Sequence, residues 1–173
     1  MSNRIQTPVA SSRSHSSDGS AQVSRQQLID FLNEDLAREY QAIIAYVVYS
    51  QKLKGAAYLA IANELEQHAL QELQHALIIA KQIDYLGGQP TVRPKEVVVS
   101  DDNKKMLQAD LDNENETVRN YRMRVRQSEA LGEFAMAEQI RGILVQEQEH
   151  QIDLATALGV EVPDMSAPVA ERG

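Results

Sequence analysis

Two copies of a Glu-x-x-His motif constrain most strongly how this chain can fold. The first runs from Glu72 to His75 and the second from Glu147 to His150, each in the middle of a stretch with helical periodicity. Residues three apart on a helix point the same way, so each motif aims one carboxylate and one imidazole at one point. Two such pairs at mid-helix, joined by two further inward glutamates, indicate a dinuclear metal site inside a four-helix bundle.

Apolar residues recur at alternating steps of three and four along four long stretches, which predicts four helices. Ser24 and Gln27 form a capping box at the start of the first helix. The second helix is expected over residues 56–86, the third after a cap at Ser100, and the fourth up to Gly159. The links at residues 52–55 and 131–132 are short, so each helix pair should be antiparallel.

The segment over residues 87–100 holds Pro90 and Pro94 and should not be helical. Extended, it can span about 40–45 Å, which matches the length of about 45 Å expected for a 30-residue helix. It can therefore cross the whole bundle, with Val97, Val98 and Val99 packed on the surface. We predict an all-α, four-helix bundle over residues 24–159 with a long crossover between the second and third helices. A flexible Ser-rich tail (residues 1–23) and a C-terminal tail (residues 160–173) flank it.

Two more glutamates, Glu39 in the first helix and Glu114 in the third, fall on the apolar lines. An unpaired carboxylate facing a core is costly. Such carboxylates can be structural if Lys or Arg pairs with them, but neither residue type follows the same lines beside these positions. Counted from the helix turns, all four glutamates and both histidines lie at nearly the same height. Two divalent cations would neutralise the four carboxylates.

The composition limits the ligands and the partners. The chain has no cysteine, which excludes disulfides and thiolate metal sites, and carboxylates with imidazoles suit iron, manganese or zinc. A formal net charge of −8 argues against binding to nucleic acid. No apolar run reaches the roughly 20 residues of a membrane span, and no apolar segment begins the chain. We therefore expect a cytoplasmic protein without a membrane partner.

Over roughly residues 25–159, the chain resembles bacterioferritins of the ferritin-like superfamily. The resemblance rests on AREYQAIIAY, QELQHA, MLQADLDNENETVRNYR and VQEQEH. It implies that Glu39 and His75 bind one metal ion and that Glu114 and His150 bind the other. It also implies that Glu72 and Glu147 bridge the two ions and that Tyr46 forms a hydrogen bond near them.

The same resemblance implies a ferroxidase that oxidises Fe(II) with dioxygen or hydrogen peroxide and stores Fe(III) inside a homo-oligomeric shell. Two iron ions per subunit are expected, with manganese as the alternative metal. Two other functions stay open. One is a di-iron or di-manganese oxidase or catalase without storage, and the other is a DNA-protecting shell of the mini-ferritin (Dps-like) type, which the negative charge disfavours.

Three features depart from the bacterioferritin pattern. Leu73 stands where bacterioferritins carry the haem-binding methionine, so no haem is expected. Gln67 and Gln71 stand near the positions of inner-surface iron ligands in some bacterioferritins, and both are weak ligands. The short C-terminal tail leaves the subunit number open between 24, 12 and fewer. His68 is an extra inward candidate, as a core histidine or a further metal contact, whereas Tyr121 is expected only as a core aromatic.

Overall fold

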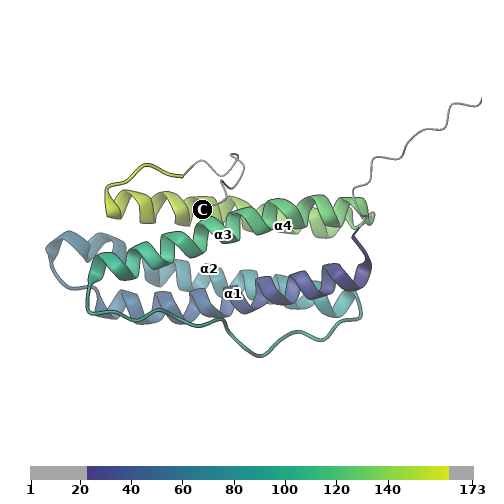
Figure 1. Ribbon diagram of the computed structural model, residues 1–173, viewed down its shortest axis with the longest axis horizontal. Helices are drawn as coiled ribbons and strands as arrows, with labels where there is room; N and C mark the ends of the chain where they lie inside the picture. The colour runs from purple at the N-terminus through teal and green to yellow at the C-terminus, as the bar shows by residue number, and fades with distance from the viewer. Residues whose placement is uncertain (1–22, 164–173) are drawn as a thin grey trace, which may run out of the picture.

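The computed structural model describes residues 23–163 and has four long helices (Figure 1). They are α1 (Arg25–Lys52), α2 (Leu59–Tyr85), α3 (Asn103–Ala130) and α4 (Phe134–Leu158), with a short 3-10 helix η1 (Ala56–Tyr58) before α2. The four-helix bundle with a crossover between α2 and α3 confirms the predicted fold class. Most of the two predicted tails lies outside the described residues, so the division of the chain into a bundle and two tails stays a prediction.

The helix boundaries follow local capping, with one correction. Ser24 and Gln27 form the predicted capping box of α1. The predicted cap at Ser100 was wrong, because the Asp102 side chain accepts the backbone N–H groups of Lys104 and Lys105. The Ser100 hydroxyl instead accepts the N–H of Asp102 at 3.1 Å. A carboxylate at this position suits the positive end of α3 better than a hydroxyl does.

The crossover runs along α1, as Figure 1 shows. The Lys95 N–H donates to the carbonyl of Ala37 at 2.9 Å, and the Tyr49 hydroxyl donates to the carbonyl of Val98. Only Val97 of the predicted valine run packs on the core, because Val98 and Val99 are exposed. The crossover is thus held more by hydrogen bonds to its backbone than by apolar burial.

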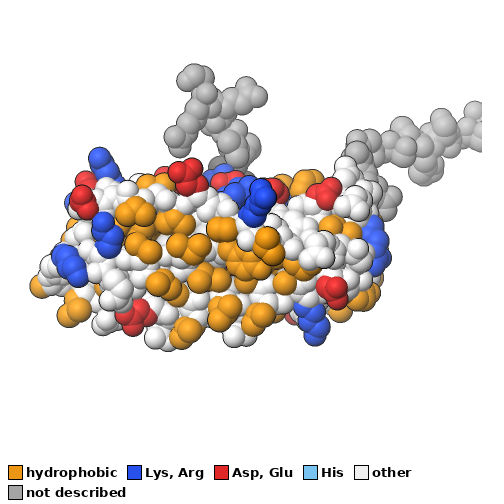
Figure 2. All heavy atoms as spheres, turned by 90° about the horizontal axis from the view of Figure 1, so that it is seen from below, with side chains coloured by type: hydrophobic (Ala, Val, Ile, Leu, Met, Phe, Trp, Pro, Cys, Tyr) orange, Lys and Arg blue, Asp and Glu red, His pale blue; other side chains and the backbone are white. Residues whose placement is uncertain are grey.

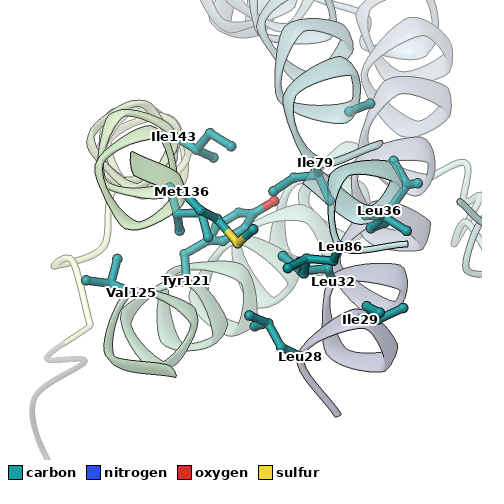
Figure 3. Close-up of a cluster of buried hydrophobic side chains, with 13 residues drawn as sticks. Leu28, Ile29, Leu32, Leu36, Ile79, Leu86, Tyr121, Val125, Met136 and Ile143 are labelled. Carbon is teal, nitrogen blue, oxygen red and sulfur yellow. The ribbon is translucent and has the colours of Figure 1, made fainter. Parts of the chain in front are cut away.

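The core consists of two apolar clusters. The first lies near the start of α1 and includes Leu28, Leu32, Ile79 and Met136 (Figure 3). The second lies toward the other end of α1 and includes Tyr49, Leu65, Leu107 and Leu154. On α4, Ile143 is buried in the first cluster, whereas its neighbour Leu144 is only partly buried.

The bundle is built from two helical hairpins, since α1 packs mainly on α2 and α3 mainly on α4. The hairpins meet through α1 with α3 and through α2 with α4. Apolar side chains gather on the face that carries the crossover (Figure 2). A shallow pocket of about 360 Å³ there is lined by Tyr40, Ile43, Ile44, Val92 and Pro94. Among the described helices, none is long and apolar enough to cross a membrane.

Candidate metal centre

Six polar side chains from all four helices form one buried layer between the two apolar clusters. Each is at most 3% exposed. They are Glu39 of α1, Glu72 and His75 of α2, Glu114 of α3, and Glu147 and His150 of α4. The structure therefore brings together the six residues that the sequence analysis selected. Helical periodicity places them because every one lies on its helix's inward line.

The six side chains divide into two groups that share two carboxylates. In each group, one ligand atom per residue lies within 4.8 Å of the others. The first group is Glu39, Glu72, His75 and Glu147, and the second is Glu72, Glu114, Glu147 and His150. The shared residues, Glu72 and Glu147, are those assigned as bridging ligands in the sequence analysis.

Each imidazole faces both shared carboxylates through its Nδ1 atom. His75 Nδ1 lies 2.9 Å from Glu147 Oε1 and 3.0 Å from Glu72 Oε2. His150 Nδ1 lies 2.9 Å from Glu72 Oε1 and 3.6 Å from Glu147 Oε2. These separations are those of neighbouring ligands around one ion, since two atoms each about 2.1 Å from a metal lie about 3 Å apart.

Several of these close contacts are not aligned as hydrogen bonds. Among the described residues, both carboxylate oxygens of Glu147 and Nδ1 of His150 lack a hydrogen-bond partner, as do Oε2 of Glu39 and Glu114. Leaving a buried polar atom unsatisfied costs about 1–3 kcal/mol. Lone pairs that converge on a common point instead of on each other fit a pair of metal ions. The residues present therefore fit a dinuclear site.

The outer nitrogen of each histidine is bound by a glutamine of the opposite hairpin. His75 Nε2 lies 2.8 Å from Gln146 Oε1, and His150 Nε2 lies 2.7 Å from Gln71 Oε1. An Nε2–H donated to an amide oxygen leaves the Nδ1 lone pair for a metal. Gln71 was expected only as a weak ligand, and the role of Gln146 was not predicted. The signal that could have found them is that each glutamine directly precedes the motif's glutamate.

Two tyrosines donate hydrogen bonds to the two unshared glutamates. The Tyr46 hydroxyl donates to Oε1 of Glu114, and the Tyr121 hydroxyl donates to Oε1 of Glu39. The bond from Tyr46 agrees with the expected hydrogen bond near the site. Tyr121 was expected only as a core aromatic, and its place beside Glu39 was missed.

Burial and mutual repulsion divide the four glutamates into two protonation classes. Burial, followed by the charges of Glu72 and Glu147, raises the pKa of Glu39 and of Glu114 well above the usual value. Burial would also raise the pKa of Glu72 and of Glu147, but the close, positively charged imidazoles lower both overall. In the metal-free site, Glu72 and Glu147 therefore carry the negative charge.

Burial and the neighbouring carboxylates also shift the pKa values of the two imidazoles. Burial opposes the charged form, but Glu147 and Glu72 raise the pKa of His150 to about 9. Glu147 and Glu39 likewise raise the pKa of His75 against the effect of burial. Two imidazolium groups then balance the two ionised carboxylates, and the empty site is close to neutral.

Two further buried groups lie beside the layer. The His68 ring stacks on the His150 ring at a centroid distance of 4.0 Å, and its Nε2 lies 3.2 Å from Asp153 Oδ2. It belongs to neither group of four ligands. Asp110, one turn before Glu114 on α3, is 2% exposed. Burial raises its pKa well above the usual value, and the periodicity of α3 did not single it out.

One buried ion pair lies a turn away from the site. Arg124 Nε lies 2.6 Å from Asp35 Oδ2, and Arg124 Nη2 lies 3.2 Å from Asp35 Oδ1. The guanidinium also stacks on the Phe31 ring, 4.6 Å from its centroid. No Lys or Arg was expected on the inward lines beside the glutamates, and Arg124 is the exception. It pairs with Asp35 and not with any of the four glutamates.

Comparison with known proteins agrees with this geometry. Residues 29–161 match the family of ferritin-like domains. The chain belongs to the ferritin-like family. Within it, a bacterioferritin of Desulfovibrio desulfuricans is 27% identical over 133 residues, which cover 76% of this chain and 74% of that protein. A bacterioferritin of Streptomyces coelicolor is 28% identical over 140 residues, covering 77% of this chain and 84% of that protein.

Solved structures of the ferritin-like family share the fold. A ferritin-like, diiron-carboxylate protein of Bacillus anthracis superposes with a TM-score of 0.74 at 32% identity, covering 78% of this chain and 96% of that chain. A dodecameric thioferritin, the bacterioferritin-related protein of Bacteroides fragilis, superposes with a TM-score of 0.73 at 26% identity. That alignment covers 80% of this chain and 88% of the other.

Proposed function

We propose that this protein is a ferroxidase that binds two Fe(II) ions per chain and oxidises them to Fe(III). The observation that carries the proposal is the sharing of Glu72 and Glu147 between two ligand groups. Iron is the substrate, and each oxidised ion gives up one electron. Two Fe(II) ions reduce one dioxygen, with two protons, to hydrogen peroxide, or one hydrogen peroxide, with two protons, to two waters.

The protein's own residues would position the ions and adjust the charge. Glu39 with His75 would hold one ion, Glu114 with His150 would hold the other, and the shared glutamates would bridge them. Tyr121 and Tyr46 orient the unshared carboxylates by hydrogen bonds. The apolar clusters on both sides of the layer limit the access of water. A fixed bridging geometry favours paired one-electron oxidation over the slow reaction of single ions.

We further propose that the chain acts as a cytoplasmic homo-oligomer that stores the oxidised iron. The dodecameric relative from Bacteroides fragilis supports this assembly. Exposed apolar residues on both helices of the first hairpin, among them Val47, Leu70 and Leu77, are surfaces that neighbouring subunits would cover.

An anaerobic titration with Fe(II), followed by oxygen, tests the proposal. We expect about two tightly bound Fe(II) ions per chain and rapid oxidation. The Glu114→Ala and His150→Ala variants should each lose one ion and most of the activity. Glu116→Ala is the matched control, because Glu116 lies on α3 outside the buried layer and pairs with Arg38. Wild-type kinetics in both site variants would contradict the assignment.

Particle size and iron content separate storage from a simple oxidase. After repeated additions of iron, a storage protein should retain many Fe(III) ions in a large, soluble particle. An oxidase would retain only the few ions held at the binding sites of each chain. Manganese dependence of peroxide breakdown would indicate a catalase, and a salt-sensitive shift of DNA mobility would indicate a DNA-protecting shell.

A further inference from the structure

A third cluster of metal-ligand side chains lies outside the six-residue layer. It consists of Glu64 and His68 on α2 and Asp153 on α4. One ligand atom from each of the three lies within 4.8 Å of the others. Glu64 is exposed and Asp153 is half-buried, whereas His68 is 3% exposed. The cluster therefore connects the surface of the bundle with its interior.

The contact between His68 and Asp153 has the spacing of two ligands on one ion. Their Nε2 and Oδ2 atoms are 3.2 Å apart, and ligands each about 2.1 Å from a metal ion are about 3–3.4 Å apart. Among the described residues, His68 Nδ1 has no hydrogen-bond partner. A structural core histidine normally uses both ring nitrogens, whereas this buried ring makes its one polar contact among the described residues through the nitrogen that faces Asp153.

A groove in the surface borders the two carboxylates of the cluster. It has a volume of about 220 Å³ and runs between the first turns of α2 and the last turns of α4. Glu64 and Asp153 both line it, beside small side chains such as Ala57, Ala60 and Ala157. Small residues leave room for a hydrated cation, and the carboxylates supply the negative field that attracts one.

We propose that Glu64, His68 and Asp153 bind a divalent transition-metal ion beside this groove. Two carboxylates and one imidazole suit Fe(II), Mn(II), Co(II) or Zn(II). The His68 ring stacks directly on the His150 ring, so the outer ion lies next to the dinuclear layer. This site is a relay that supplies ions to the pair, and that role rests on the ferroxidase function proposed above.

Counting Co(II) in the metal-free full-length protein tests the binding site. Equilibrium dialysis with Co(II), followed by metal analysis, should give three ions per chain in the wild type. Asp153→Asn and Glu64→Gln should each reduce the number to two, because each removes one carboxylate ligand. Both positions reach solvent, so the amide should not disturb folding. Glu66→Gln is the matched control. It removes the same charge from an exposed position of α2 outside the cluster and should keep three ions.

Stopped-flow oxidation of limiting Fe(II) tests the relay. In the Asp153→Asn variant, iron should reach the dinuclear site several-fold more slowly, and the final amount of oxidised iron should be unchanged. The Glu66→Gln variant should match the wild type in both. Equal filling rates in all three proteins would overturn the relay. Two Co(II) ions in the wild type, both retained in Asp153→Asn, would overturn the site. Failure of the ferroxidase function has a different signature, because Glu114→Ala and the wild type would then oxidise iron equally slowly while the Co(II) site persists.

Discussion

Tyr121 on α3 donates a hydrogen bond to Glu39 on α1, and both side chains are almost completely buried. The bond fixes the one glutamate of the first ligand group that is not shared with the second group. Its counterpart in the second group is the bond from Tyr46 to Glu114.

Replacing Tyr121 by Phe should weaken the binding of the ion held by the first ligand group more than that of the ion held by the second. The phenyl ring fills the same space, so the change removes only the hydrogen bond to Glu39. Loss of such a supporting contact typically costs about 10- to 100-fold in metal affinity or activity. Anaerobic titration with Fe(II) should show one ion bound with reduced affinity and one bound with unchanged affinity. Tyr49→Phe is the control, since Tyr49 bonds only to the crossover backbone, and equal affinities in the Tyr121→Phe and Tyr49→Phe variants would refute the expected role.

The metal-free protein should lose stability as the pH rises, and Glu39 should be one cause. The pKa of Glu39 is raised in the fold above the value of 4.5 expected in the unfolded chain. Its favourable contribution is therefore complete below about pH 4.5 and is lost as the pH rises through the folded pKa. Glu39→Gln keeps an acceptor for Tyr121 and removes the ionisation.

Thermal melts of chelator-treated protein between pH 4.5 and 8 check this expectation. The Glu39→Gln variant should equal the wild type at the acid end and melt higher at the neutral end. Adding metal should reverse the order, because an ion at 100 times its dissociation constant stabilises the wild type by about 2.7 kcal/mol. A variant that melts lower than the metal-free wild type at neutral pH would identify Glu39 as a structural partner.

Metal binding should release protons, and metal affinity should fall as the pH falls. The raised pKa values of Glu39, Glu114 and both imidazoles mean that these four groups hold protons in the empty site. Two divalent ions should therefore displace about four protons. A titration with Zn(II) in weak buffer, followed with a pH indicator, counts them. Fewer than two protons per pair, or an affinity that does not change between pH 6 and 8, would contradict the charge assignment.

Removing the Arg124 guanidinium should destabilise the bundle strongly. Burial, opposed by Arg124, raises the pKa of Asp35 to about 6. Arg124→Met leaves this carboxyl group buried without its partner, which typically costs about 3–5 kcal/mol. Denaturant unfolding measures the loss. The double variant Arg124→Met with Asp35→Leu should recover most of it, and a double variant as unstable as the single one would show that packing on Phe31 dominates.

Added haem should not bind as a bis-methionine complex. Leu73, the residue at the haem-ligand position of bacterioferritins, is 45% exposed on α2 and has no donor atom for iron. Spectra of the purified protein after adding haem should stay those of free haem. Leu73→Met offers a positive comparison, and a stoichiometric low-spin spectrum in the wild type would show that another side chain takes the place of methionine.

Periodicity alone was enough to predict the layer at Glu39, Glu72, Glu114 and Glu147, because the inward face of a helix repeats every three to four residues. It could not predict which side chains would meet from different helices. His75 and Gln146 are 71 positions apart, and Asp35 and Arg124 are 89 apart. Such pairs depend on helix rotation and height, which one sequence does not contain.

Capping was predictable only where a single residue could act. Ser24 had one matching partner in Gln27, and the cap was confirmed. Ser100, Asp101 and Asp102 are three successive residues whose side chains are able to cap α3. The structure uses Asp102, and periodicity in the sequence could not choose among the three.

The hydrogen bonds that two tyrosines and two glutamines make with the metal layer join one hairpin to the other. His75 reaches Gln146, His150 reaches Gln71, Tyr46 reaches Glu114 and Tyr121 reaches Glu39. Neither half of the chain can thus assemble a complete coordination shell on its own. If the two hairpins separate, both ion sites lose ligands at the same time. Bound metal therefore holds the hairpins together, and release of the metal reports their separation even while the individual helices stay folded.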